Sequence, residues 1–299
     1  MTDYRIRRGL VGLVAVLSAA AVWAAPASAG GVVTTPALTP GSTYLALGDS
    51  VTFGYVESKV VPAPNYHNAA GFLGYPEHLA RELGIKVVNA ACPGESSASL
   101  VSAKAQSNGC ENTLAGPGGY RTLFPLHVKY TGSQLGFAVH YLRTHKKVRL
   151  VSLMIGANDG FLCQESTADH CTSLSEQKAL LARISANVTT ILKAIRHRAH
   201  YHGQIVIVNY YSLNYASPAQ NRLSTALNVT QDNAGKPFGV EIADGYGEFK
   251  AQATPFGGDV CQAGLINSWG TPRCPTTAVH PTYAGQALLA EAVLDAIRL

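Results

Sequence analysis

The chain has 299 residues, of which 47% are hydrophobic and 14% charged, and it carries a formal net charge of +5. Its basic residues are spread along the sequence without a Lys/Arg cluster, which argues against a nucleic-acid-binding protein. With 29 glycines, the composition is typical of a compact, loop-rich globule, and the length favours one large domain over two small ones.

The first 29 residues have the pattern of a secretory signal peptide. Three arginines at positions 5, 7 and 8 precede an uncharged apolar run over residues 9–25, and Ala27-Ser28-Ala29 supplies a cleavage site. An uncleaved membrane anchor is the alternative, but the run is shorter than the roughly 20 residues that a spanning helix needs. We therefore expect cleavage near Ala29, a secreted soluble protein and a mature net charge of about +3, since three arginines and Asp3 are removed.

After a lead-in over residues 30–43, short β-rich runs alternate with longer helical ones up to the end of the chain. Strands are predicted at residues 44–47, 86–89, 148–155, 204–208 and 240–242, and helices at 72–83, 133–144, 173–199, 218–231 and 284–297. This alternation predicts one α/β domain over residues 44–299, a three-layer α/β/α doubly wound parallel sheet. Such folds place their sites at the carboxyl ends of the strands, so the functional residues are expected in the loops there.

Six cysteines follow the leader, an even number in a chain expected to reach an oxidising compartment. Six cysteines allow 15 pairings. A zinc site is the alternative, but the sequence has no Cys-x-x-Cys spacing. The cysteines fall into sequence-local pairs around irregular stretches, which favours the disulfides Cys92–Cys110, Cys163–Cys171 and Cys261–Cys274.

Four polar motifs occur in order along the chain, three of them directly after predicted strands. The first strand leads into a serine, the second into a glycine and the third into an asparagine, and a histidine precedes the last helix. The motifs are Gly48-Asp49-Ser50, Asn89-Ala90-Ala91-Cys92-Pro93-Gly94, Gly156-Ala157-Asn158-Asp159 and His280-Pro281-Thr282.

This ordered set resembles the SGNH (GDSL) hydrolase superfamily, and the resemblance extends from residue 44 to residue 299. It implies a flavodoxin-like sheet of about five strands and acyl transfer by a nucleophilic serine. Residue by residue, it implies Ser50 as nucleophile, His280 as general base, and an oxyanion hole formed by Ser50, Gly94 and Asn158. The alternative for Gly94 and Asn158 is an ordinary role in loops and turns.

The chemistry of ester hydrolysis gives each of these residue types a reason. A serine hydroxyl needs a base whose pKa lies near the working pH, which histidine supplies. Of the ten histidines, only His280 lies in one of the four motifs. The developing oxyanion needs donors already in place, and two backbone N–H groups and one side-chain amide are available. Glycine suits position 94 because a Cβ would obstruct the close approach of substrate.

One departure from the family pattern concerns the residue that orients His280. The family usually has an aspartate three residues before the histidine, and this chain has Thr277 there. We expect a backbone carbonyl at or near Thr277 to accept the Nδ1 proton, as in some secreted actinobacterial-type members. Asp244 or Asp259 is the alternative. Asp49 and Asp159 are interpreted as loop braces.

The expected activity is hydrolysis of carboxylic esters by an esterase or lipase, including the phospholipase A type, without a metal or organic cofactor. The segment 96–135 carries Leu114, Tyr120, Leu123, Phe124 and Leu126 and is a candidate acyl groove, with a plain surface loop as alternative. Two alternative functions are deacetylation of carbohydrates by an acetyl esterase, and binding without catalysis by an inactive protein with a hydrolase scaffold. The expected partners are an acyl ester or lipid and, transiently, a lipid surface, with no nucleic acid, and the protein is expected to be a monomer.

Overall fold

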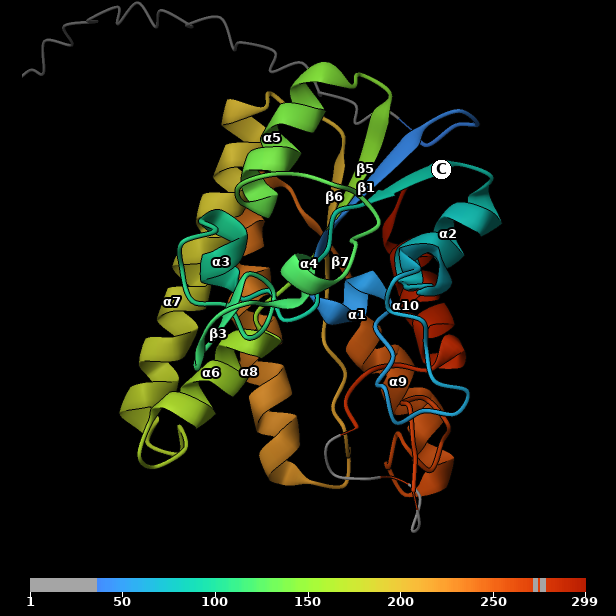
Figure 1. Cartoon of the computed structure of the whole chain (residues 1–299). Helices are drawn as coiled ribbons and strands as arrows, with labels where there is room; N and C mark the ends of the chain where they lie inside the picture. Colours follow the sequence, from blue (N-terminus) through green and yellow to red (C-terminus); the bar gives the residue numbers. More distant parts are fainter. Residues whose placement is uncertain (1–36, 271–273, 275–277) are drawn as a thin grey trace, which may run out of the picture. The chain divides into compact units, whose positions relative to one another are not determined.

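A parallel five-stranded sheet forms the centre of the computed structural model, which describes residues 37–270, 274 and 278–299 (Figure 1). Its order is β2-β1-β5-β6-β7, and all neighbouring strands are parallel. The strands are β1 (Thr43–Gly48), β2 (Lys86–Asn89), β5 (Val148–Met154), β6 (Gln204–Val208) and β7 (Glu241–Ala243). All five predicted strands are confirmed, with ends that differ by one residue at most.

Helices cover both faces of this sheet. On one face lie α3 (Ser97–Val101), α5 (Gln134–Thr144), α7 (Leu174–Lys193) and α8 (Pro218–Gly235), and on the other α2 (Tyr75–Leu83), α9 (Gly245–Ala253) and α10 (Tyr283–Ala296) (Figure 1). Shorter elements are α1 (Ser50–Phe53), α4 (Tyr120–Leu123), α6 (Ala157–Ser166) and a small hairpin of β3 (Asn112–Thr113) and β4 (Gly116–Pro117). The predicted α/β/α architecture is therefore confirmed.

The long helices begin where the sequence offers a capping side chain. Ser133, Ser173 and Ser217 each accept a hydrogen bond from a backbone N–H in the first turn of α5, α7 and α8, and Thr282 does the same for α10. The predicted helix 173–199 is divided, because α7 ends at Lys193 and a π-helical turn follows over Ala194–Arg198.

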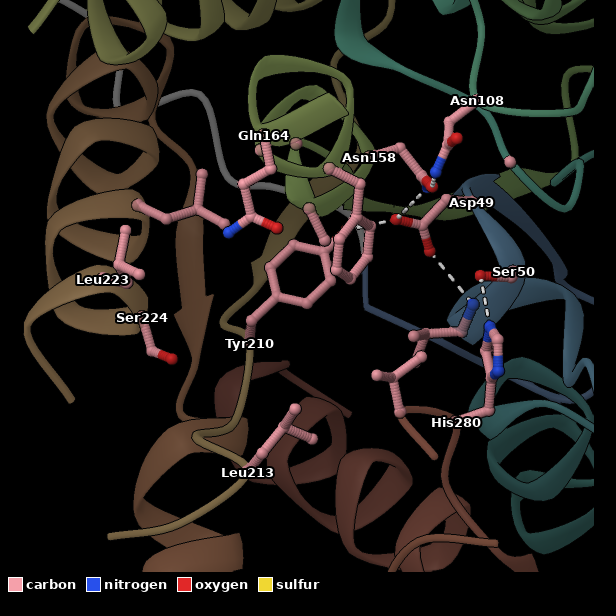
Figure 2. A pocket seen from close by; sticks show the side chains of 18 of the residues that line it. Asp49, Ser50, Asn108, Asn158, Gln164, Tyr210, Leu213, Leu223, Ser224 and His280 are labelled. Carbon is pink, nitrogen blue, oxygen red and sulfur yellow. Dashed lines mark hydrogen bonds between the residues drawn. The ribbon is translucent and has the colours of Figure 1, made fainter. Parts of the chain in front are cut away.

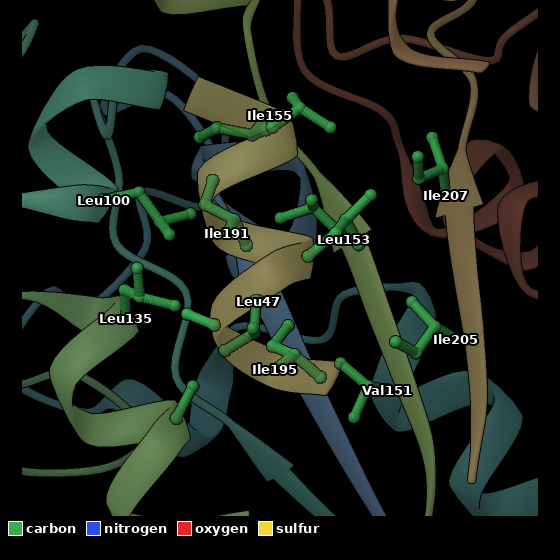
Figure 3. Close-up of a cluster of buried hydrophobic side chains, with 14 of the residues drawn as sticks. Leu47, Leu100, Leu135, Val151, Leu153, Ile155, Ile191, Ile195, Ile205 and Ile207 are labelled. Atoms are coloured by element: carbon green, nitrogen blue, oxygen red, sulfur yellow. The ribbon is translucent and has the colours of Figure 1, made fainter. Parts of the chain in front are cut away.

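Two apolar clusters hold the layers together. Figure 3 shows the first, in which Ile191 and Ile195 on the α7 side face Leu153 and other strand side chains. The second lies between the opposite face of the sheet and α2, α9 and α10. Because β5 and β6 are buried on both faces, both strands are apolar almost throughout.

Three disulfides close irregular segments, in the pairing expected from the sequence: Cys92–Cys110, Cys163–Cys171 and Cys261–Cys274. Disulfides are typical of proteins that fold in an oxidising compartment. The segments assigned to the signal peptide and to Thr277 lie outside the described residues. None of the helices in the described residues has both the length and the apolar character needed to cross a membrane.

Candidate active site

The candidate nucleophile, Ser50, lies at the carboxyl end of β1 and is the first residue of α1. Asp49 caps this short helix by accepting a hydrogen bond from the N–H of Val51 at 3.0 Å. Within the described residues, the backbone N–H of Ser50 has no acceptor, as expected for the first turn of a helix. The first turn of α1 thus presents two groups of Ser50, its hydroxyl and a backbone N–H that has no acceptor among the described residues.

The end of β1 is held in place by Gln134 of α5. Its side chain accepts from the N–H of Gly48 at 2.7 Å and donates to the carbonyl of Gly48 at 3.0 Å. A Cβ at Gly48 would lie 2.3 Å from the carbonyl oxygen of Met154, so only glycine fits where β1 meets β5. These contacts fix the backbone two residues before Ser50.

His280 reaches Ser50 from the segment that precedes α10. Its Nε2 lies 2.9 Å from Oγ of Ser50, although 230 positions separate the two residues (Figure 2). Its main chain is fixed as well, since the His280 carbonyl accepts from the N–H of Asn267 at 2.8 Å. The predicted serine and histidine are therefore close enough for proton transfer from the hydroxyl to the ring.

The other ring nitrogen of His280 contacts a residue that the sequence reasoning missed. Nδ1 lies 2.9 Å from Oε1 of Glu57, in the loop between α1 and α2. Because a carboxylate only accepts hydrogen bonds, Nδ1 carries the proton and Nε2 accepts from the serine hydroxyl. Both side chains are largely buried, with exposed fractions of 15% for His280 and 13% for Glu57.

Glu57 is itself held by neighbours and is ionised. Asn267 donates through Nδ2 to Oε2 of Glu57 at 2.9 Å. Burial by itself raises the pKa of Glu57. The hydrogen bond and the charge of His280 lower this pKa, as does the hydrogen bond from Asn267. Together they outweigh burial, so the pKa of Glu57 lies below its usual value. A charged carboxylate therefore faces the ring at neutral pH.

This geometry corrects the expected histidine–carbonyl arrangement. Thr277 lies outside the described residues, and the Nδ1 contact is made by Glu57. Asp244 caps α9 by accepting from the N–H of Gly247, and Asp259 accepts from the N–H groups of Cys261 and Gln262. A signal for Glu57 was present, because it is the only acidic residue between Ser50 and α2.

Gly94 and Asn158 line the same cavity as Ser50 and His280. Gly94 has a φ of +81°, and a Cβ there would lie 2.4 Å from the carbonyl oxygen of Asn108, so the position requires glycine. In the described part of the chain, its N–H has no hydrogen-bond acceptor. Asn158 is buried in the first turn of α6, with its amide near Asp49. Both oxyanion candidates therefore line the cavity that the candidate nucleophile and base also line.

Asp49 and Asp159 act as buried braces. Oδ2 of Asp49 accepts from the hydroxyl of Tyr210 at 2.5 Å, and from Nδ2 of Asn158 at 3.4 Å. Burial raises the pKa of Asp49 from 3.8 to about 6, although the hydrogen bonds from Tyr210 and from the N–H of Val51 oppose the rise. Asp159 accepts from the hydroxyl and the N–H of Ser97, which ties α6 to α3.

The cavity has a volume of about 620 Å³, within the usual range for small-molecule sites. Its wall away from Ser50 is formed by α6, α7 and α8 and is largely apolar. Leu223 lies across the cavity from Ser50 and His280 (Figure 2). The larger apolar side chains of these helices that line the cavity are those of Phe161, Leu180, Leu181, Ile184, Leu223 and Leu227.

The expected acyl groove in segment 96–135 is wrong in most of its residues. Tyr120 lines the cavity and belongs to an aromatic cluster with Phe53 and Phe72. Phe124 and Leu126 pack against this cluster and do not line the cavity. The other two candidates, Leu114 and Leu123, are exposed on the surface.

The fold and the comparisons together define a hydrolase of the esterase/lipase type. Residues 46–288 match the model of the GDSL-like Lipase/Acylhydrolase family, and the chain belongs to that family. Family membership implies ester substrates. A comparison with curated protein sequences finds no match.

Solved structures of similar fold come from distant relatives. A lipase from a goat rumen metagenome has a TM-score of 0.54 at 13% identity, covering 85% of this chain and 97% of its own. A putative GDSL-like lipase from Parabacteroides merdae has a TM-score of 0.51 at 15% identity, covering 87% and 98%. An acetylxylan esterase from Geobacillus stearothermophilus has a TM-score of 0.50 at 17% identity, covering 86% and 94%. At these identities, the similarity shows the fold alone.

Proposed function

We propose that the chain is a secreted serine esterase or lipase that cleaves acyl esters through an acyl-enzyme on Ser50. The observation that carries the proposal is the line of hydrogen bonds from Glu57 through His280 to Ser50, at the wall of a largely apolar cavity. A nucleophile, a base and a group that orients the base are the three parts that acyl transfer by serine requires.

In the proposed reaction, His280 Nε2 takes the hydroxyl proton as Ser50 Oγ attacks the ester carbonyl. The carboxylate of Glu57 keeps the ring in the required tautomer and stabilises the imidazolium that forms. The carbonyl oxygen becomes an oxyanion and accepts from the N–H groups of Ser50 and Gly94 and from Nδ2 of Asn158. A donor of this kind is typically worth about 3 kcal/mol of transition-state stabilisation.

Collapse of the first tetrahedral intermediate expels the alcohol, which receives the proton held by His280. Water then enters, and the same base takes its proton as the water attacks the acyl-enzyme. The acid leaves and Ser50 recovers its proton. All groups used in these steps come from one chain, so the protein is proposed to act as a monomer.

The cavity favours an acyl chain longer than acetate as the group transferred to Ser50. Side chains of α6, α7 and α8 provide apolar surface next to the nucleophile, and burying an acyl chain there gains about 0.8 kcal/mol for each methylene. This argues for esterase or lipase activity over deacetylation of carbohydrates. Secretion is supported by the three disulfides and by the signal-peptide pattern of the first 29 residues.

A chain-length series tests the function directly. Purified mature protein is assayed on p-nitrophenyl esters from acetate to palmitate, on acetylated xylan and on phosphatidylcholine vesicles, with Ser50→Ala as control. We expect kcat/KM to rise from acetate to medium-length chains and the control to be inactive. Fatty acid released from the vesicles would identify a phospholipase A. Activity confined to acetate and acetylated xylan would identify an acetyl esterase, and no turnover on any ester would contradict the proposal.

A further inference from the structure

Asn108 lies in the loop between α3 and β3, outside the four motifs, and lines the cavity beside the candidate catalytic groups (Figure 2). We propose that Asn108 is a positioning residue that aligns two separate donors of the oxyanion hole, Gly94 and Asn158. The inference rests on the proposed serine-hydrolase function, because an oxyanion forms only if Ser50 attacks an ester.

The amide of Asn158 is held between two side chains, those of Asn108 and Asp49. Nδ2 of Asn108 donates to Oδ1 of Asn158 at 2.9 Å, while Nδ2 of Asn158 faces Oδ2 of Asp49 at 3.4 Å (Figure 2). An amide turned by 180° would place its oxygen against the carboxylate and its NH₂ group against that of Asn108. The two neighbours therefore hold the Asn158 NH₂ group on the side of Asp49.

This orientation leaves one hydrogen of the amide for the substrate. The NH₂ group of Asn158 has two donors, and Asp49 uses one of them. The reversed amide would offer an oxygen to the developing oxyanion and repel it. A side chain that fixes the amide thus stabilises the transition state without touching the substrate.

The main chain of Asn108 contacts the second donor residue. Its N–H donates to the carbonyl of Gly94 at 2.8 Å. The backbones are packed closely, since a Cβ on Gly94 would fall 2.4 Å from the carbonyl oxygen of Asn108. One residue therefore links the loop after β2, which provides Gly94, with α6 after β5, which provides Asn158.

The position of Asn108 is fixed by its own loop. The disulfide between Cys92 and Cys110 closes the segment that contains both Gly94 and Asn108, with a Cα–Cα distance of 5.7 Å. Asn112 and Ser107 brace the same loop, because Oδ1 of Asn112 accepts from the N–H of Ser107 at 2.9 Å. Asn112 makes no hydrogen bond to Asn158 among the described residues, so it offers a matched control for the stability of the loop.

The test is a double-mutant cycle on kcat and KM with a p-nitrophenyl ester. Asn108→Ala keeps the backbone contact with Gly94 and removes only the side-chain bond. We expect it to lower kcat by about 10- to 100-fold with KM within about twofold, as for a displaced catalytic group. Asn158→Ala should lower kcat by about 10²- to 10³-fold. The double variant should be no slower than Asn158→Ala alone, because Asn108 acts through that amide.

Two further variants separate positioning from loop stability. Asn108→Asp replaces the donor by a carboxylate of the same size and should lose at least as much kcat as Asn108→Ala. Asn112→Ala should lower the melting temperature while kcat stays within about threefold of wild type.

The proposal is overturned if the kcat of Asn108→Ala equals that of wild type. It is also overturned if Asn108→Ala lowers kcat by the same factor in the Asn158→Ala background, or if Asn112→Ala lowers kcat as much as Asn108→Ala does. Failure of the proposed function looks different. In that case the wild type has no ester turnover, or Asn158→Ala retains full activity.

Discussion

The carboxylate of Glu57 lies 2.9 Å from Nδ1 of His280, across 223 positions of sequence. Glu57 follows the nucleophile in the chain, whereas the family's usual acid is three residues before the histidine. The acceptor therefore comes from the loop after β1, while position 277 carries a threonine. A Ser50–His280–Glu57 triad replaces the expected dyad as the arrangement to be tested.

Glu57→Gln should lower kcat by about 10³- to 10⁴-fold with a small change in KM. Glutamine keeps the size of the side chain but removes the charge that stabilises the imidazolium and orients the ring. Asp259→Asn is the matched control, because Asp259 accepts from two backbone N–H groups and makes no hydrogen bond to His280 among the described residues. It should stay within about threefold. A Glu57→Gln protein that is folded and nearly as active as wild type would contradict the triad.

The stability of Asp49→Asn relative to wild type should increase with pH. Burial raises the pKa of Asp49 from 3.8 to about 6 in the folded protein. Between about pH 4 and pH 6 the unfolded chain has lost this proton while the folded chain retains it, so wild type loses stability as pH rises. Asp49→Asn lacks this titrating group, so it avoids a loss of unfolding free energy that reaches about 3 kcal/mol in wild type. Urea unfolding at the two ends of this range measures the difference.

Glu57→Gln should show the opposite trend in the same experiment. The pKa of Glu57 is lowered in the folded protein, so its charge stabilises the native state above the pKa of the unfolded chain. That contribution is lost as pH falls through the folded pKa. Glu57→Gln should therefore become less stable relative to wild type as pH rises. A difference in unfolding free energy that does not change with pH would count against the ion pair between Glu57 and His280.

Removal of the Cys92–Cys110 disulfide should reduce catalysis as well as stability. Replacing both cysteines by serine releases the loop that carries Gly94 and Asn108. The Cys163–Cys171 pair, at the end of α6, is the control. Each double variant should lose about 2 to 4 kcal/mol of unfolding free energy. Only the first should also lower kcat below the unfolding temperature, and equal kcat losses in both would refute this distinction.

Filling the cavity at α7 should shift the acyl preference toward short chains. Ile184 is buried and lines the cavity, close to Gly156 and Leu227. Ile184→Phe should therefore lower kcat/KM for long-chain esters by at least about tenfold relative to acetate. Leu174→Phe, on the exposed start of the same helix, should leave the ratio unchanged. An unaltered ratio in Ile184→Phe would place the acyl chain elsewhere.

Much of the fold could be predicted because its signals are local. Buried parallel strands such as β5 and β6 are mostly apolar, and serine caps mark where α5, α7 and α8 begin. Helix α9 was missed because Gly245 and Gly247 lie in its first turn and weaken the helical pattern. Helix α6, which carries Asn158, was missed because its sequence has no apolar residues repeating at helical spacing.

The candidate site was predictable only where residues belong to motifs. Ser50, Gly94, Asn158 and His280 follow predicted strands or precede the last helix. Glu57 lies in a long loop without periodicity, and its contact with His280 depends on how that loop folds back in space. Asn108 is likewise placed by tertiary contacts, and the cavity beside Ser50 is formed by the packing of three helices.

The most direct test is labelling with a fluorophosphonate, followed by peptide mapping of the modified serine. The Ser50–His280–Glu57 account predicts one adduct, on the peptide that contains Ser50. Labelling should be absent in Ser50→Ala and slowed by about 10²-fold or more in His280→Ala and Glu57→Gln, since His280 is the base that activates the hydroxyl and Glu57 orients it. An adduct on a different serine, or equal labelling of Ser50→Ala, would contradict the account.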